Sequence, residues 1–239
     1  MIAAQNSTKT KKQTMKGENF FDRLLLLPLF QGIGRNDFWE IAEQTRISFH
    51  SCEADTLLVE QDAPCESLLF IMNGKICAAR TNDSHTYTLR EYMERPDVLQ
   101  PESLFGPITH YTRTYTAITP VQYFEIKKRD VRDRLLLYPT FRINYLNLLT
   151  RQAQHSLRHL WQTTPEALSQ RFIHFVHARS LRPAGPKELT IKMQDLATEL
   201  LTTRLNVSYM LRELEAEQLI RTHRGRIEIP QFEKLVQRL

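Results

Sequence analysis

The sequence predicts an α+β fold: a β-rich N-terminal domain of barrel or jelly-roll type, a long helix, and a C-terminal winged helix-turn-helix. Three observations predict it. Short apolar segments separated by turns occupy about residues 20–128, a helical apolar period follows Pro139, and residues 192–214 have the pattern of two short crossing helices. The chain has 239 residues, which is enough for two domains with separate cores.

The first 16 residues carry four lysines, Lys9, Lys11, Lys12 and Lys16, with no acidic residue and few apolar side chains. Such a segment buries too little apolar surface to repay the conformational entropy lost on ordering. We therefore expect residues 1–17 to form a mobile basic tail. An alternative interpretation of this tail is that its lysines contact DNA phosphates.

A β-rich domain is expected over residues 18–135, after a first helix around Asp37–Gln44. Runs of apolar and β-branched residues bounded by turn residues predict strands, and Asn73-Gly74 and Asn82-Asp83 supply turn chemistry between them. The predicted strands are Thr56–Val59, Ser67–Met72, Lys75–Ala79, Tyr87–Leu89, Thr114–Ile118 and Gln122–Ile126. Many short strands at this spacing are typical of a barrel or jelly roll.

A long helix is predicted within residues 136–162, because apolar side chains recur there at steps of three and four residues. A stripe of this length needs a partner, which is either the chain's own domains or a second copy in a two-fold coiled coil. We favour the second copy. The residues expected at that dimer interface are Phe141, Tyr145, Leu148, Leu149 and Leu157.

A separate C-terminal domain is expected over residues 163–239. Its first helix should start at residues 163–166, where Thr163 and Thr164 provide a cap, Pro165 suits a first turn and Glu166 is favoured by the helix dipole. The period and the cap chemistry together predict that this helix is distinct from the preceding long one.

Residues 192–214 have the pattern of a helix-turn-helix, the motif that places a helix in the major groove of DNA. The positions predicted to form its core are Leu196, Leu200, Val207, Met210, Leu211 and Leu214, with the small Ala197 where the two helices come closest. Polar residues remain on the outward side of the second helix. That side is the candidate surface for reading DNA.

Residues 220–229 predict a hairpin with a glycine near its tip. Arg221, Arg224 and Arg226 place three positive charges there without an acidic residue among them. We expect them to contact backbone phosphates and to add affinity more than sequence choice. The net charge of +5 suits a polyanionic partner.

In their order, these segments resemble the Crp/Fnr family of bacterial transcription regulators over nearly the whole chain after the tail. The resemblance rests on residues 27–30 (Leu-Pro-Leu-Phe), 69–76 and 123–127, on the helix-turn-helix, and on residues 214–220 leading into the hairpin. It implies a homodimer with a barrel of cyclic-nucleotide-binding type, a dimerisation helix, and a winged helix-turn-helix that binds a pseudo-palindromic operator in double-stranded DNA. It also implies contact with RNA polymerase.

The resemblance assigns base contacts to the N-terminal half of the second helix of the motif. Arg204 matches the family's base-reading arginine, whose planar fork can bind O6 and N7 of a guanine together. Leu205 and Tyr209 stand where the family usually has a glutamate and a second arginine, so the operator should differ from the best-known one. Leu205 would meet a thymine methyl group and Tyr209 a phosphate or a base. The expected DNA-binding residues are Lys192, Thr202, Thr203, Arg204, Leu205, Asn206, Ser208, Tyr209, Arg221, Arg224 and Arg226.

Leu201 stands at the turn position that is glycine in many motifs of this kind. If the position requires a positive φ, a leucine there is strained by about 1 to 2 kcal/mol. The turn would then be wider than usual, which affects the helix boundary and not the motif.

The effector is left open by the resemblance. Cyclic-nucleotide receptors of this type hold the ribose with a glycine-glutamate pair, and the cyclic phosphate with a later arginine and a serine or threonine. In one register the effector contacts are Glu102, Arg113 and Thr114, with Pro101 in place of the glycine. In the other, Pro107 and Tyr111 replace the glutamate and the arginine, and the phosphate loses its charge-assisted pair.

No cofactor is therefore predicted, and a cyclic nucleotide or haem is kept as an alternative. His155 and His159 lie one helical turn apart, as do His174 and His177, but no carboxylate or cysteine stands at a matching spacing. The three cysteines match no zinc or iron–sulfur pattern, so no metal site is predicted. A ligand-sensing module that does not bind DNA is the competing class of function.

An enzyme is not predicted, because the chain has no phosphate-cradling glycine loop, no G-x-S-x-G elbow and no H-E-x-x-H pair. The apolar run over residues 20–30 contains charges and is far shorter than the roughly 20 residues needed to cross a bilayer. It also lacks the order of features found in a secretory signal. We expect a cytoplasmic protein without a membrane partner.

Overall fold

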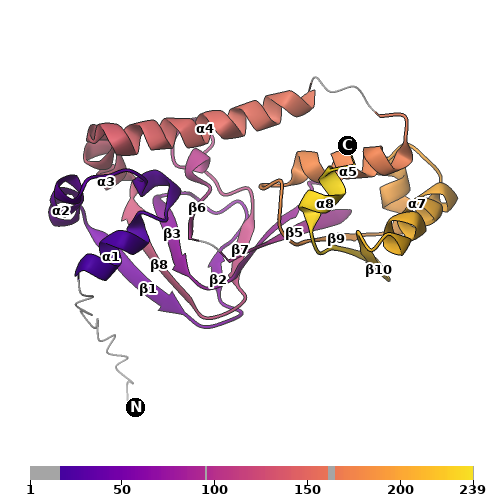
Figure 1. Cartoon of the computed structure of the whole chain (residues 1–239), viewed down its shortest axis with the longest axis horizontal. Helices are drawn as coiled ribbons and strands as arrows, with labels where there is room; N and C mark the ends of the chain where they lie inside the picture. Colours follow the sequence, from indigo (N-terminus) through magenta and orange to yellow (C-terminus); the bar gives the residue numbers. More distant parts are fainter. Residues whose placement is uncertain (1–16, 95, 161–164, 239) are drawn as a thin grey trace, which may run out of the picture.

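The computed structural model of the chain describes residues 17–94, 96–160 and 165–238, and Figure 1 shows them as two domains connected by a long helix. This helix, α4 (Pro139–Leu160), lies along the N-terminal domain and reaches toward the C-terminal one. The basic tail expected at the N-terminus lies outside the described residues as far as residue 16. No helix in the described part of the chain is long and apolar enough to span a membrane.

The N-terminal domain consists of jelly-roll-like antiparallel sheets and not of a closed barrel. One sheet has the order β1-β8-β3-β6, and β2, β7, β4 and β5 belong to the other. The strands are β1 (Ile47–Cys52), β2 (Leu57–Val59), β3 (Ser67–Asn73), β4 (Ile76–Thr81), β5 (Tyr87–Met93), β6 (Asp97–Leu99), β7 (Thr114–Ala117) and β8 (Val121–Lys127). Phe70 and Phe124 stack in the first sheet and share one buried core with Ala78 and Tyr115 of the second. All six predicted strands are present, whereas β1 and β6 were not predicted.

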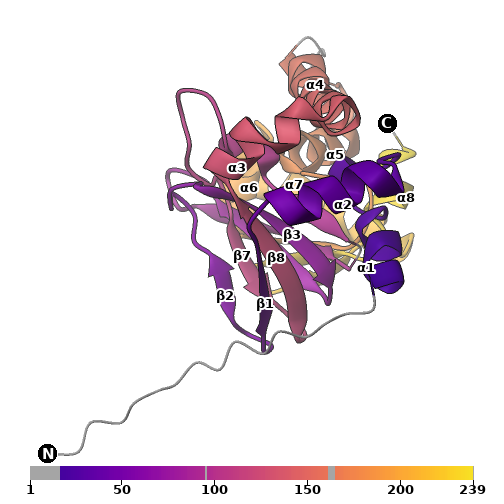
Figure 2. The ribbon, with the colours of Figure 1, turned by 90° about the vertical axis from the view of Figure 1, so that its left-hand side faces the viewer.

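Short helices cover the end of this domain that is away from the C-terminal domain (Figures 1 and 2). They are α1 (Gly17–Leu24), α2 (Arg35–Gln44) and α3 (Lys128–Asp133), and the 3-10 turns of the domain are η1 (Pro28–Phe30), η2 (Pro101–Ser103) and η3 (Leu135–Leu137). The segment at residues 27–30 is part of the core, with Leu27, Leu29 and Phe30 almost fully buried. The predicted first helix corresponds to α2, whereas α1 was missed.

The N-terminal half of α4 packs on its own domain, which corrects the expected dimer interface. Phe141 is buried with its ring centroid 5.5 Å from that of Phe30. Tyr145 is also buried, and its hydroxyl donates a hydrogen bond to the carbonyl of Pro101 at 2.5 Å. These two side chains fill the core of their own domain and are not available to a second copy.

Another face of α4, which we call the outer face, is exposed. Leu148 and Leu149 are only partly buried against the N-terminal core. The outer face comprises Ile143, Leu146, Thr150, Ala153 and Leu157, and its three large apolar side chains are 51%, 51% and 55% exposed in that order. These positions are spaced by three, four, three and four residues, the period of a coiled-coil seam. Only Leu157 of this set was in the expected interface.

The C-terminal domain combines a three-helix core with a three-stranded sheet. Its elements are α5 (Leu168–Arg179), β9 (Lys187–Ile191), α6 (Met193–Glu199), α7 (Arg204–Ala216), β10 (Arg221–His223), β11 (Arg226–Ile229) and α8 (Phe232–Val236). α5 begins at Leu168, after an extended Ala167. The helix start expected at residues 163–166 is therefore wrong, because the described residues of that range, 165 and 166, are not helical. Residues 161–164 lie outside the described residues.

β5 joins the two domains into one sheet. It pairs antiparallel with β9, from Tyr87 opposite Ile191 to Glu91 opposite Lys187. The result is a seven-stranded sheet with the order β10-β11-β9-β5-β4-β7-β2 (Figure 1). Leu89 of β5 is buried in the core of the C-terminal domain. The N-terminal domain therefore supplies both a strand and a core side chain to the C-terminal domain.

Candidate DNA-binding surface

α6 and α7 form the helix-turn-helix around a buried core. The predicted core side chains are all 4% exposed or less, namely Leu196, Ala197, Leu200, Val207, Met210, Leu211 and Leu214. The backbone N–H of Thr202 donates to the carbonyl of Ala197 at 2.9 Å and closes the turn where the small side chain permits close approach. Arg171 of α5 supports the same turn, because its guanidinium donates to the carbonyl of Leu200 at 2.8 Å. The core of the motif is as predicted.

Leu201 has the left-handed backbone that its position suggested. Its φ is +51°, and its side chain is 82% exposed. Only residues 200–203 separate α6 from α7, which is the usual length for this turn. The expected widening therefore does not occur, and the leucine bears the backbone strain.

The N-terminus of α7 is held by hydroxyl and amide groups. The Oγ1 of Thr203 accepts a hydrogen bond from the backbone N–H of Asn206 at 3.2 Å, as an N-cap does. The side-chain amide of Asn206 donates to the Oγ1 of Thr202, also at 3.2 Å. Three of the expected DNA-binding residues thus first serve to fix the start of the helix.

Arg204, Leu205 and Tyr209 extend from the exposed side of α7. Leu205 is 61% and Tyr209 is 54% exposed. Arg204 makes no ion pair and no side-chain hydrogen bond with the described residues. Lys192 is exposed just before α6, whereas Ser208 is half-buried. The exposed surface at the N-terminal half of α7 therefore offers one arginine and two partly apolar side chains.

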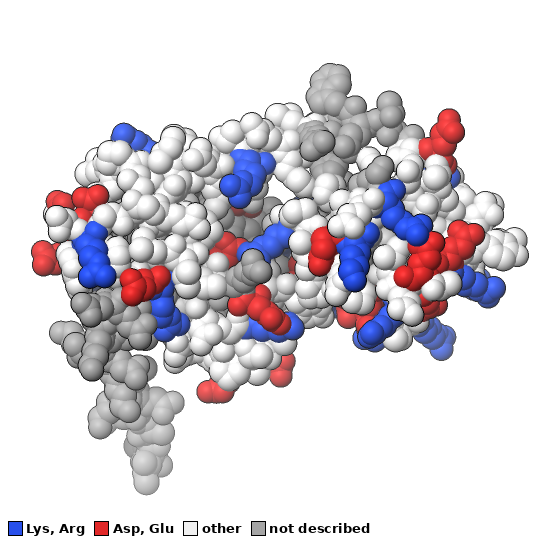
Figure 3. Space-filling view, viewed as in Figure 1, with Lys and Arg blue, Asp and Glu red and all other residues white. Residues whose placement is uncertain are grey.

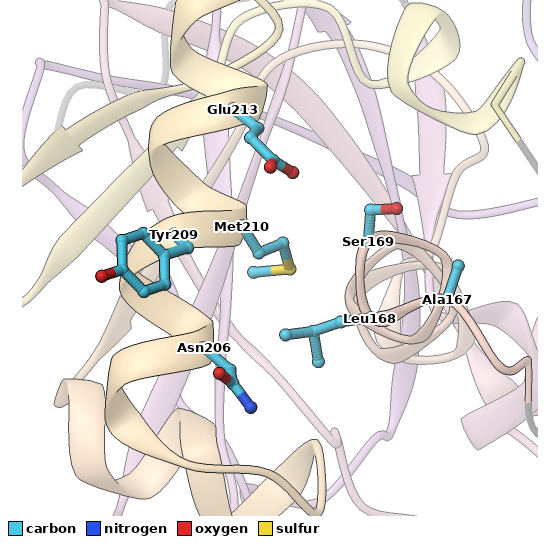
Figure 4. Close-up of a pocket in the computed structure, with 7 residues that line it drawn as sticks. All are labelled: Ala167, Leu168, Ser169, Asn206, Tyr209, Met210 and Glu213. Carbon is cyan, nitrogen blue, oxygen red and sulfur yellow. The ribbon is translucent and has the colours of Figure 1, made fainter.

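The side of α7 that faces α5 adjoins this exposed side, and Tyr209 lies at the boundary between them. Figure 4 shows a pocket between the two helices, with Met210 directed across it toward Leu168 and with the Tyr209 ring directed away. The residues that line it are Ala167, Leu168, Ser169, Asn206, Tyr209, Met210 and Glu213. Contacts with α5 therefore occupy one side of α7 and leave the side of Arg204 and Leu205 uncovered.

The wing is the hairpin β10–β11, with Arg224 and Gly225 at its tip as expected. Gly225 has a φ of +73°, which a glycine adopts without strain. Arg226 is already engaged: its Nη2 lies 2.9 Å from Oε1 of Glu228 and its Nη1 lies 3.9 Å from Oε2 of Glu188. Arg221 and Arg224 are exposed and have no ion pair with the described residues. The three wing arginines therefore differ in whether an acidic side chain already neutralises their charge.

α7 and the wing are fastened to each other by Glu215. Its carboxylate accepts hydrogen bonds from the backbone N–H of Thr222 at 2.6 Å and from the Thr222 hydroxyl at 2.8 Å. These hydrogen bonds hold the pKa of Glu215 below its ordinary value. The helix that carries Arg204 and the strand that carries Arg221 therefore have a defined relative position.

Basic and acidic side chains are mixed on the face of the C-terminal domain seen in Figure 3. No patch of a single sign stands out among the described residues on this face. The position of the proposed DNA-binding residues at the start of α7 and on the wing identifies them more clearly than net charge does.

Arg113, the expected phosphate contact, is buried at the junction of the two domains. Its Nη1 lies 3.4 Å from Oε1 of Glu91, and its Nη2 donates to the carbonyl of Arg179, at the end of α5, at 2.9 Å. The Nζ of Lys187 lies 2.6 Å from Oε2 of the same Glu91. Burial lowers the pKa of both Arg113 and Lys187, and the Glu91 carboxylate opposes this shift. The guanidinium that would hold a cyclic phosphate already has a carboxylate partner.

The other expected effector contacts, Glu102 and Thr114, make no hydrogen bond or ion pair with Arg113 in the described part of the chain, although the Glu102 carboxylate is close enough to raise the pKa of Arg113. The Thr114 hydroxyl accepts a hydrogen bond from the backbone N–H of Gln61 at 3.1 Å. Oε2 of Glu102, on η2, is buried without a hydrogen-bond partner among the described residues. Tyr111, from the alternative register, is buried and donates to the carbonyl of Ser67 at 3.2 Å.

His155 and His177, one from each predicted pair of histidines, contribute to helix packing. The rings of His155 on α4 and His177 on α5 meet edge to face, with centroids 5.2 Å apart. No group of three or more histidine, cysteine, aspartate or glutamate side chains that could hold a metal ion is found among the described residues.

Glu91 and Lys187 were not singled out from the sequence. One feature of the sequence could have identified Glu91. It follows the predicted strand Tyr87–Leu89 and lies on the same face of β5 as the buried Leu89, so a charged side chain is expected in the interior there. The partner of Glu91 lies 96 residues away, and no local pattern identifies it.

Two family models match the chain in the order of its two domains. A cyclic nucleotide-binding domain matches residues 49–137, and a Crp-like helix-turn-helix domain matches residues 163–238. No curated protein matches the chain.

Solved structures of similar fold include several regulators of this type. The Thermus thermophilus catabolite activator protein is 16% identical, with 88% of this chain and 96% of that chain covered and a TM-score of 0.46. The c-di-GMP responsive global regulator CLP of Xanthomonas campestris is 15% identical, with 82% and 99% covered and a TM-score of 0.48. A second Thermus thermophilus protein, a transcriptional regulator of the Crp/Fnr family, is 18% identical, with 80% and 97% covered and a TM-score of 0.44.

The chain thus combines a cyclic nucleotide-binding domain with a Crp-like helix-turn-helix domain that follows it. The chain belongs to the Crp/Fnr family of transcription regulators.

Proposed function

We propose that the chain is a homodimeric, sequence-specific DNA-binding regulator that reads a pseudo-palindromic operator and responds to a signal received by its N-terminal domain. The observation that carries the proposal is the uncovered N-terminal half of α7, from which the exposed side chains of Arg204, Leu205 and Tyr209 project. RNA polymerase is a further partner that the family membership suggests.

Arg204 is the proposed base-reading residue. An exposed arginine without an ion-pair partner among the described residues keeps its whole fork for a guanine, and such a bidentate contact is worth about 1 to 3 kcal/mol of discrimination. Leu205 is proposed to contact a thymine methyl group, because an exposed apolar side chain beside the arginine has no polar edge to offer. Tyr209, one turn further on, is proposed to contact a phosphate or a base.

The wing and the start of α6 are proposed to contact the DNA backbone. Arg221, Arg224 and Lys192 are exposed and can each neutralise a phosphate. Arg226 is proposed to contribute less than these, because its charge is shared with Glu228 and Glu188. Thr202, Thr203, Asn206 and Ser208 are proposed to position the helix and to bind phosphate.

A second copy is proposed to cover the outer face of α4. A stripe of Ile143, Leu146 and Leu157 at coiled-coil spacing would otherwise remain in water. Two-fold pairing of this helix would bring two α7 helices to half-sites about one DNA turn apart. The pseudo-palindrome therefore follows from the dimer.

The proposal is tested by selecting operator sequences from a random pool of double-stranded DNA with the full-length chain. We expect enrichment of a pseudo-palindrome whose half-sites contain a guanine followed or preceded by a thymine. Enrichment of no sequence above the starting pool, with the protein folded, would contradict the proposal.

A further inference from the structure

We propose that Glu91, Arg113 and Lys187 are positioning residues that fasten the DNA-binding domain to the N-terminal domain in one register. We call these three residues the junction cluster. The inference concerns how the recognition helix is held relative to the N-terminal domain, and it goes beyond the proposed contacts with DNA.

Glu91 is the centre of the junction cluster, and its partners come from several segments. Its Oε1 accepts a hydrogen bond from the backbone N–H of Leu181 at 2.7 Å, and its Oε2 accepts one from Arg182 N–H at 3.3 Å. Lys187 and Arg113 supply the two cations. The carboxylate therefore binds the connection after α5, the first residue of β9 and the arginine directly before β7 at once.

All three side chains of the junction cluster are withdrawn from water. Those of Glu91, Arg113 and Lys187 are 3%, 5% and 1% exposed. Buried ion pairs add little net stability because both charges lose their hydration, but loss of one partner leaves an uncompensated charge. Such a cluster therefore adds little to the strength of the contact between the two domains, but it determines which of their surfaces can meet.

The charges on β5 and β9 also fix the register of the two strands. Glu91 is opposite Lys187, and the next rung places Arg90 opposite Glu188 at 3.1 Å, on the more exposed face. A slip of one residue would place Arg90 opposite Lys187 or Glu91 opposite Glu188, which brings like charges together. A slip of two would place a buried charge opposite Leu89 or Leu189. Only the observed register places an acidic side chain opposite a basic one at both positions.

Arg113 connects this junction to the interior of the N-terminal domain. It lies directly before β7, which pairs with β4 in the same sheet, and its guanidinium reaches the end of α5. A shift of Arg113 would therefore loosen the contact with Glu91 and the contact with Arg179 together. The junction cluster is thus where a rearrangement of the N-terminal sheet would meet the DNA-binding domain.

The proposal is tested by hydrogen exchange on the full-length chain. Lys187→Met removes one cation and retains a side chain of similar length. We expect the β5 and β9 amides that bond across the junction to exchange at least about tenfold faster, while α7 amides stay within about twofold. The matched control is Lys234→Met, the same substitution at an exposed lysine of α8 outside the junction cluster, for which junction exchange should change by less than about twofold.

A second variant keeps the test decisive. Glu91→Gln leaves both cations without a carboxylate, and we expect the same selective loss of protection at the junction. Junction amides that remain protected in Lys187→Met would overturn the proposal. So would amides that lose protection only together with those of α7, because the junction cluster would then merely stabilise the C-terminal domain.

Discussion

Arg226 and Glu228 form an ion pair along one wing strand, with Nη2 and Oε1 2.9 Å apart, whereas Arg224 at the tip of the same hairpin has no such partner among the described residues. These two arginines are only two positions apart but differ in their ability to bind a phosphate. Arg226 would have to break its ion pair with Glu228 before it binds DNA, whereas Arg224 would not.

We expect Arg224→Ala to weaken binding to all DNA sequences and to reduce the salt slope by about one phosphate contact. Arg226→Ala should reduce the slope by less, because part of that charge is already neutralised within the wing. Binding constants measured over a range of salt concentrations on operator and random DNA would check this. A loss confined to one base preference, or equal slopes for the two variants, would contradict it.

We expect Arg204→Ala to weaken operator binding by about 1 to 3 kcal/mol and to relax the sequence preference at one position per half-site. The control is Arg212→Ala, because Arg212 is an exposed arginine two turns further along α7. Selection from a random DNA pool, followed by affinity measurements, distinguishes the two variants. An unchanged preference for Arg204→Ala would remove Arg204 from the base contacts.

We expect Leu201→Gly to stabilise the folded chain by about 1 kcal/mol, because glycine adopts a positive φ without the steric cost that leucine has. The exposed leucine side chain loses little burial on removal. Leu205→Gly, within the helical region of α7, should instead destabilise the chain by a similar amount. The free energy of unfolding of both variants is measured by chemical denaturation. A lower value for Leu201→Gly than for the unchanged chain would contradict the proposal that Leu201 is strained.

We expect Leu146→Glu to convert the proposed dimer into a monomer, because it places a charge on the outer face of α4. Leu137→Glu is the matched control, since Leu137 is 69% exposed on η3 and does not lie on that face. Sedimentation velocity at micromolar concentration would compare them. A wild-type chain that sediments as a monomer, with or without DNA, would rule out the proposed dimer.

We expect cyclic AMP and cyclic GMP not to bind at physiological concentration. The Arg113 guanidinium is paired with Glu91, so a cyclic phosphate would have to displace a buried carboxylate. Isothermal titration calorimetry on the full-length chain measures this directly. Micromolar affinity that is abolished by Arg113→Ala would show that the arginine releases its partner and binds the ligand.

The parts of the structure that could be predicted are those encoded by local periodicity. Leu196 and Leu200 are four residues apart, as are Val207 and Leu211, and the predicted core of the motif is the observed one. The wing was predicted for a similar reason, because its turn residues and flanking arginines are adjacent in the sequence.

The parts that could not be predicted depend on pairing between distant segments. α4 is apolar on more than one face, and its sequence does not say that Phe141 turns to its own domain while Leu146 turns outward. The role of Arg113 was expected from a ligand motif, but its partners are decided by the pairing of β5 with β9. Such pairings are properties of the folded chain and not of any short segment.

The strand that the N-terminal domain contributes to the seven-stranded sheet has a practical consequence for the C-terminal domain. Cut free at about residue 163, that domain would keep β9 but lose β5, and the five residues Lys187–Ile191 would become an open edge with unpaired backbone groups. The place of Leu89 would be vacant beside that edge. Exposed edges of this kind recruit other strands. The excised domain should therefore self-associate through β9, and its solubility would depend on a strand that lies outside its own sequence.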